Sequence, residues 1–269
     1  IGFALQHLAN FGFGPQSLPA NLTLALGTGQ VTPLEMARGF AVFANGGALV
    51  TPYFIQSVQD SDGNELFQAA PPRACGLCDF EAAGVTSEDP AAAANAGVEA
   101  RAPQAISPAN AFVMTDMMTD VIQRGTAQRA AVALKRKDIA GKTGTTSDRR
   151  DTWFVGFNAD IAAAVWLGFD QERSLGENEE GGKTALPMWI YFMQEALRDK
   201  PEHRQPEPPG VVRTWVSRES GAPTRAGAPG ALFETFLEQY PPQTGMGGFG
   251  DDGVGAETLE PAAADESIF

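Results

Sequence analysis

Three apolar, strand-like runs follow one another between residues 138 and 170: DIAGKTGT, TWFVGFNAD and IAAAVWLGFD. The gaps between them are too short for the crossover connections that parallel strands require. The pattern therefore predicts three antiparallel neighbours joined by tight turns, with Trp153, Phe154 and Trp166 in the core. The amphipathic run that follows, TALPMWIYFMQEALRDK, predicts a helix that packs against this sheet.

Further helices are predicted before the sheet. Residues 3–11 have helical spacing of apolar side chains. In VTPLEMARGFAVFANGG, Thr32 precedes Pro33 and stands three residues before Glu35, which is typical of a capping box. SPANAFVMTDMMTDVIQRG begins with a similar start signal, Ser107 followed by Pro108, and ends at Gly125. The chain thus combines long helices with an antiparallel sheet, which predicts a mixed α/β fold.

Shorter signals predict a hairpin and, near the C-terminus, short elements followed by an unstructured stretch. ALVTPYFIQSVQDSDGNELFQ indicates two strands joined at DSDGN. Beyond Pro201, VVRTWVSRESG predicts a strand and ALFETFLEQY a short helical turn. Residues 81–105 and 241–269 are rich in small, acidic and turn-forming residues without apolar periodicity. We therefore expect a main domain over 1–200 with a mobile insertion at 81–105, a C-terminal extension over 201–240 and a disordered tail over 241–269.

Charge and cysteine content restrict the classes of partner. The net charge of −14 argues against nucleic acid, because phosphate binding requires a basic stripe. No run of the sequence is long and apolar enough for a membrane span. Cys75 and Cys78 form one CGLC motif, and neither His7 nor His203 lies at metal-ligand spacing, so no metal site is predicted. A loop disulfide and two free thiols both remain open for this pair.

The segment IAGKTGTTSDRRDTWFVGF raises two chemical alternatives. A phosphate-binding loop of the form GxxxxGK[ST] would need a glycine where this chain has Arg136, so the backbone could not wrap a phosphate. The alternative is a KTG motif at the end of a strand, which penicillin-binding proteins and β-lactamases combine with SxxK and SxN. A strand edge can bind an extended peptide there.

The KTGT residues suit acyl transfer to a serine. The ammonium of Lys142 supplies positive potential, the hydroxyls of Thr143 and Thr145 can hold a carboxylate, and Gly144 lets a ligand approach the backbone. The neighbouring Arg149, Arg150 and Asp151 are equally well explained by a site mouth or by a solvated turn. For Thr126, a helix-ending turn is favoured over a position near the cleft.

Four runs in the same order give the chain a resemblance to the transpeptidase domain of class A penicillin-binding proteins. They are LPANLTLALGTGQVTPLEMARGFAVFANGG, PYFIQSVQDSDGNELF, NAFVMTDMMTDVIQRGTAQRA and the KTGT segment; LFETFLEQYPP is similar to the family's C-terminal tail. The resemblance covers residues 1–240. It implies a penicillin-binding-protein/β-lactamase-like fold, an antiparallel sheet flanked by helices, and D,D-transpeptidation through an acyl-serine in peptidoglycan synthesis.

The resemblance also implies roles for the KTGT residues and a cellular location for the protein. Lys142 would tune the site, Thr143 and Thr145 would hold the carboxylate of a stem peptide or β-lactam, and the Thr145 N–H would be one oxyanion donor. No cofactor is implied. The family is anchored in the bacterial inner membrane and works on its periplasmic side, where envelope activator proteins are possible partners and a Cys75–Cys78 disulfide would be stable.

The chain departs from the family pattern in one respect. No serine has a lysine three positions later or an asparagine two positions later, so SxxK and SxN are both missing. We expect an N-terminally truncated domain, inactive alone, whose nucleophile, membrane anchor and glycosyltransferase domain lie upstream. The alternatives are a β-lactamase or D,D-carboxypeptidase of the same superfamily, or a non-catalytic module that binds envelope partners.

Overall fold

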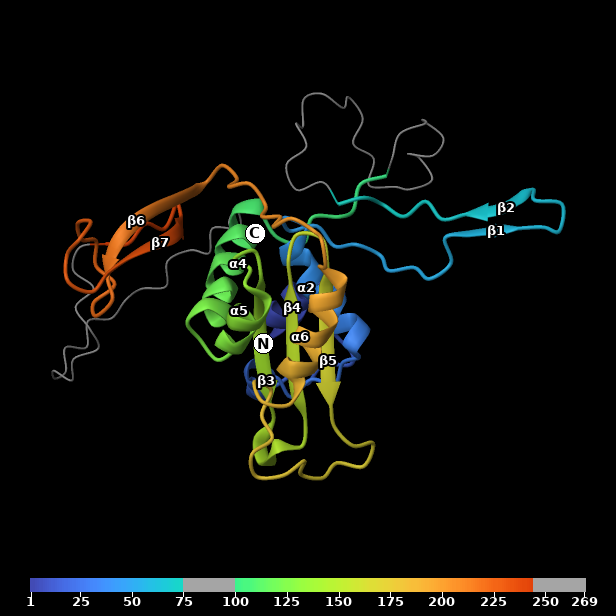
Figure 1. Ribbon diagram of the computed structural model, residues 1–269, viewed down its shortest axis with the longest axis horizontal. Coiled ribbons are helices and arrows are strands. Elements are labelled where there is room, and N and C mark those ends of the chain that lie inside the picture. The colour runs from blue at the N-terminus through green and yellow to red at the C-terminus, as the bar shows by residue number, and fades with distance from the viewer. Residues whose placement is uncertain (75–99, 244–269) are drawn as a thin grey trace. The chain divides into compact units, whose positions relative to one another are not determined.

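The computed structural model describes residues 1–74 and 100–243 (Figure 1). The chain divides into two compact units, residues 1–208 and residues 209–269. The Cys75–Cys78 pair, most of the predicted insertion and nearly all of the predicted tail lie outside the described residues. No helix in the described residues is long and apolar enough to cross a membrane.

The first unit is built on a three-stranded antiparallel sheet in the order β3–β4–β5. The strands are β3 (Ala140–Thr145), β4 (Thr152–Phe157) and β5 (Ala162–Leu167). Pairing is continuous along β4, from Ala140 opposite Phe157 to Thr145 opposite Thr152 on one side, and without a bulge on the other. The predicted meander is therefore confirmed, and β4 is its central strand.

Helices cover both faces of this sheet (Figure 1). On one face, the Trp189 ring of α6 (Ala185–Ala196) packs edge-on against Phe154, with the ring centroids 4.9 Å apart. On the other face, Phe157 contacts the rings of Phe40 and Phe43 from α2 (Pro33–Ala44). These alternating faces follow from the two-residue period of a strand.

Two helix starts match their predicted signals. Thr32 and Glu35 form a complete capping box at α2, since each side chain accepts a hydrogen bond from the other residue's backbone N–H. Ser107 caps α4 (Pro108–Gln123) by accepting from the Asn110 N–H. α4 contacts α2 and runs beside β3. Capping satisfies backbone donors that the first turn would otherwise leave unpaired.

The remaining elements of the first unit are short. They are α1 (Gly2–Asn10), the 3-10 helix η1 (Leu22–Leu26), the hairpin strands β1 (Ser57–Gln59) and β2 (Glu65–Gln68), α5 (Gln128–Leu134) and the 3-10 turn η2 (Ser147–Arg149). β1 and β2 pair antiparallel, as predicted for the residues around DSDGN. α5 was not anticipated from the sequence.

Residues 100–105, the end of the predicted insertion, are hydrogen bonded to the body of the first unit. The Leu49 N–H donates to the Pro103 carbonyl, and the Ala105 N–H donates to the Gly47 carbonyl. The Gln104 amide also donates to the Gly46 carbonyl at 3.0 Å. This backbone pairing fixes the approach of the chain to α4.

The described part of the second unit is an antiparallel hairpin of β6 (Val211–Ser217) and β7 (Ala231–Leu237). The predicted strand at 211–221 is confirmed, but the predicted helical turn at 231–240 is wrong. Every residue of β7 pairs with one of β6, from Ala231 opposite Ser217 to Leu237 opposite Val211. A partner strand supplies hydrogen bonds that the local sequence of 231–240 does not reveal.

Candidate active site

The four predicted site residues occupy the last four positions of β3, which is an edge strand of the sheet in the described residues. Lys142, Thr143, Gly144 and Thr145 lie opposite Val155, Phe154, Trp153 and Thr152 of β4, respectively. Among the described residues, no other strand pairs with β3. One edge of the KTGT segment therefore has backbone groups that can pair with an extended peptide.

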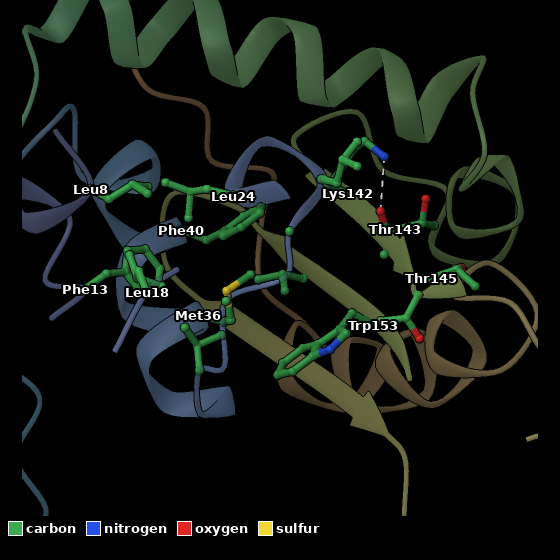
Figure 2. A pocket seen from close by; sticks show the side chains of 17 residues that line it. Leu8, Phe13, Leu18, Leu24, Met36, Phe40, Lys142, Thr143, Thr145 and Trp153 are labelled. Carbon is green, nitrogen blue, oxygen red and sulfur yellow. Dashed lines mark hydrogen bonds between the residues drawn. The ribbon is translucent and has the colours of Figure 1, made fainter. Parts of the chain in front are cut away.

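A groove of about 330 Å³ opens beside this segment (Figure 2). All four KTGT residues line it, together with Trp153 and Val155 of β4. Apolar side chains from α1, α2 and the chain between them complete its wall: Leu8, Phe13, Leu18, Leu24, Met36 and Phe40. The groove thus has one polar side, formed by an edge strand, and one apolar side.

The Lys142 side chain is exposed and lies on the groove (Figure 2). Its Nζ donates to the carbonyl of the adjacent Thr143 at 3.1 Å. In the part of the chain that the structure describes, no carboxylate forms an ion pair with it. The ammonium therefore gives the groove a positive potential that a salt bridge does not offset.

The two threonine hydroxyls are held by residues from distant segments. The Thr143 Oγ1 lies 3.0 Å from the Thr126 Oγ1, in the turn between α4 and α5. The Thr145 Oγ1 accepts a hydrogen bond from the Gly181 N–H at 3.0 Å. Thr126 thus lies in the turn that follows α4, as favoured from the sequence, and its hydroxyl contacts the KTGT strand.

Gly181 was missed by sequence reasoning, although two adjacent glycines before an amphipathic helix are a signal of close backbone approach. A Cβ on Gly181 would lie 2.4 Å from the Trp153 carbonyl oxygen and 2.6 Å from the Gly144 carbonyl oxygen. Only glycine fits at this distance. The backbone just before α6 therefore packs directly against β3 and β4.

The turn after β3 is both exposed and structured. Asp148 and Arg149 have positive φ angles of 59° and 52°, which L-residues adopt at an energetic cost. The Arg149 carbonyl accepts from the Leu175 N–H at 2.9 Å, and Arg150 forms ion pairs with Asp148 and Glu172. These residues line hollows beside Thr146, so the turn borders the site as well as the solvent.

Trp166 differs from its prediction as a core residue. It is 37% exposed, and its Nε1 donates to the Asp151 carboxylate at 2.9 Å. Phe154 is fully buried, as predicted. Trp166 lies opposite Trp153, and both side chains line a hollow next to the turn after β3.

The groove lacks a serine nucleophile within the described residues, since no serine is among the side chains that line it. This agrees with the absence of SxxK and SxN from the sequence. The KTGT segment therefore supplies a lysine, hydroxyls and a free strand edge. A nucleophile must come from elsewhere for acyl transfer to occur.

The chain is similar to proteins of known name. It is 44% identical over 260 residues to penicillin-binding protein 1A of Pseudomonas aeruginosa, an alignment that covers 89% of this chain and 32% of that protein. Penicillin-binding protein 1A of Neisseria lactamica is also 44% identical, over 212 residues, which cover 79% of this chain and 23% of that protein. The chain thus spans about a third of the length of these relatives or less.

Solved structures give the same result. Penicillin-binding protein 1A from Haemophilus influenzae superposes with a TM-score of 0.79 at 37% identity, covering 90% of this chain and 37% of that chain. The PonA1 protein from Mycobacterium tuberculosis, solved in complex with penicillin V, has a TM-score of 0.54 at 25% identity, covering 72% and 46%. The sequence profile of the penicillin binding protein transpeptidase domain matches residues 7–185, which run from the second half of α1 to the first residue of α6. The chain therefore belongs to the penicillin-binding protein transpeptidase domain family and has the fold that its resemblance to this family implied.

Proposed function

We propose that this chain is the C-terminal part of the transpeptidase domain of a class A penicillin-binding protein. The full protein would cross-link peptidoglycan stem peptides by D,D-transpeptidation through an acyl-serine, and β-lactams would acylate the same serine. The observation that carries the proposal is the free KTGT edge beside a groove that bears Lys142. The relatives' names and the family profile support it.

The proposed roles follow from the groups that each residue brings to the groove. The Lys142 ammonium would stabilise negative charge near the nucleophile, and the hydroxyls of Thr143 and Thr145 would donate to the substrate carboxylate. The Thr145 N–H would be one oxyanion donor, with Gly144 leaving room for the substrate backbone. The residues present require no metal or organic cofactor for this chemistry.

The proposal extends to parts outside this chain. The nucleophile, the SxN motif, a glycosyltransferase domain and a membrane anchor would belong to the remaining two thirds of a protein as long as its Pseudomonas relative. The domain would then work on the periplasmic side of the bacterial inner membrane. Envelope activator proteins would be additional partners, and the chain alone would be inactive.

Acylation by a fluorescent penicillin tests the proposal in the natural gene product that contains this chain. Lys142→Ala and Thr143→Val should each lower the second-order acylation rate, because each removes a charge-assisted contact from the acylation transition state, and such a contact contributes about 2–4 kcal/mol. Lys137→Ala, an exposed lysine before the same strand, is the matched control and should react like wild type.

Two outcomes would contradict the proposal. Wild-type rates in both site variants would remove the KTGT segment from the active site. A full-length protein that is never acylated would favour the non-catalytic module, whereas rapid release of hydrolysed penicillin would favour a β-lactamase.

A further inference from the structure

Thr126 is fixed beside the KTGT segment by the turn that contains it. The Ala127 side chain is fully buried, and its N–H donates to the Val121 carbonyl at 3.0 Å. Gly125 lies so close to this helix end that a Cβ would be 2.8 Å from the Val121 Cα. These contacts set the Thr126 hydroxyl 3.0 Å from the Thr143 hydroxyl, although the Thr126 side chain itself is exposed.

A threonine hydroxyl has one proton to donate and two lone pairs that accept. On Thr145, the Gly181 N–H occupies an acceptor position, which leaves the hydroxyl proton available to a ligand. On Thr143, the neighbouring Thr126 hydroxyl can occupy the equivalent position. When Thr126 donates to Thr143, the protons of both KTGT hydroxyls remain available for donation to a ligand.

An anion in the groove would favour this arrangement of protons. The Lys142 ammonium lies on the same groove and attracts negative charge to it. With a carboxylate accepting from Thr143, the hydrogen bonds run from Thr126 to Thr143 to the carboxylate in one direction. Hydrogen bonds in such a chain polarise and strengthen one another.

We infer that Thr126 is a positioning residue that orients the Thr143 hydroxyl towards the substrate carboxylate. The inference rests on the proposed function and adds a residue from outside the KTGT segment to carboxylate recognition. Thr126 acts through Thr143 and need not touch the substrate.

The backbone of Gly182 completes the arrangement. A Cβ on Gly182 would lie 3.0 Å from the Thr126 carbonyl oxygen and 3.8 Å from the Thr143 Cγ2. The turn before α5, the KTGT strand and the chain before α6 therefore converge at these two hydroxyls. A methyl group at position 126 can replace the hydroxyl without a change of shape, so Thr126→Val isolates the hydrogen bond.

The test uses the natural gene product and two probes, benzylpenicillin and its methyl ester, which lacks the carboxylate charge. Thr126→Val should lower the acylation rate with benzylpenicillin about three- to tenfold, as expected for the loss of one hydrogen bond between uncharged groups. The rate with the ester should not change. Thr126→Ser, which keeps the hydroxyl, should restore the rate with benzylpenicillin.

Thr119→Val is the matched control, because that hydroxyl donates to the Thr115 carbonyl within α4 at 2.9 Å. It should leave both rates unchanged. A wild-type rate for Thr126→Val with benzylpenicillin would overturn the inference. Equal slowing with both probes, or no rescue by serine, would also overturn it, because a purely structural effect does not depend on the carboxylate.

The proposed function fails in a distinguishable way. If the wild-type protein is acylated by neither probe, the function is wrong and the role of Thr126 falls with it. If the wild type is acylated and Thr143→Val is slow, the function stands, and only the comparison of the Thr126 variants decides the inference.

Discussion

Arg136 and Asp138 form a two-point ion pair just before β3. The guanidinium Nε lies 2.9 Å from one carboxylate oxygen, and Nη2 lies 2.7 Å from the other. The Asp138 side chain is 0% exposed. It also accepts from the Asn158 amide and from the His203 N–H, while Arg136 donates to the carbonyls of residues 200 and 201. The pair thus joins the start of β3 to the chain that follows α6.

Removal of one partner should destabilise the first unit. Arg136→Gln leaves the buried carboxylate of Asp138 without its cation, which costs about 3–5 kcal/mol in free energy of unfolding. Urea unfolding followed by tryptophan fluorescence measures the change. Arg150→Gln removes two exposed ion pairs and is the control, with an expected change of less than about 1 kcal/mol. Equal effects of the two substitutions would mean that burial of Asp138 does not matter.

The same carboxylate predicts a pH dependence of stability. Burial by itself raises the pKa of Asp138, but hydrogen bonds from Arg136, the His203 N–H and Asn158 outweigh it and leave the pKa below its ordinary value of 3.8. A group with a depressed pKa stabilises the fold above its unfolded pKa and loses this contribution as pH falls through the folded pKa. The stability difference between wild type and Asp138→Asn should be constant near neutral pH and shrink below about pH 4. A difference that grows on acidification would show the opposite sign of the shift.

The capping box predicts a local effect at α2. Thr32→Ala removes the acceptor for the Glu35 N–H, 3.2 Å away, and should cost about 1 kcal/mol. Thr51→Ala, an exposed threonine outside any helix, should be close to neutral. Thermal unfolding of both variants under the same conditions provides the comparison. No difference between them would show that the cap does not limit the stability of this unit.

Close packing at Gly181 predicts a graded glycine series. Gly181→Ala places a methyl group 2.4 Å from a backbone oxygen and should destabilise the unit by about 2 kcal/mol. Gly182→Ala meets its nearest atom at 3.0 Å and should cost less, while Gly2→Ala meets nothing within 4 Å. The order of unfolding midpoints should follow these distances. A Gly181→Ala variant as stable as Gly2→Ala would show that the chain before α6 is not seated on β3.

Local signals in the sequence determined the elements that carry the candidate site. The capping box at Thr32 and Glu35 and the closely spaced strands of 138–170 each depend on residues within a few positions of one another, so they can be recognised without the fold. The KTGT segment was found for the same reason, because its four residues are contiguous. The chemistry proposed for this segment depends on its residue types and on its position at a strand edge. The close spacing of the three strand-like runs in 138–170 had already implied such a strand.

Tertiary structure alone decided which distant residues meet. Thr126 reaches Thr143 across 17 positions, Gly181 reaches Thr145 across 36, and Asp138 receives the His203 N–H across 65. No local pattern encodes these distances, because they depend on how α4, α6 and the sheet pack. The strand at Ala231–Leu237 was missed for the same physical reason. Its residues form a strand because β6 supplies their hydrogen-bond partners, and a partner strand is a property of the folded chain rather than of the segment itself.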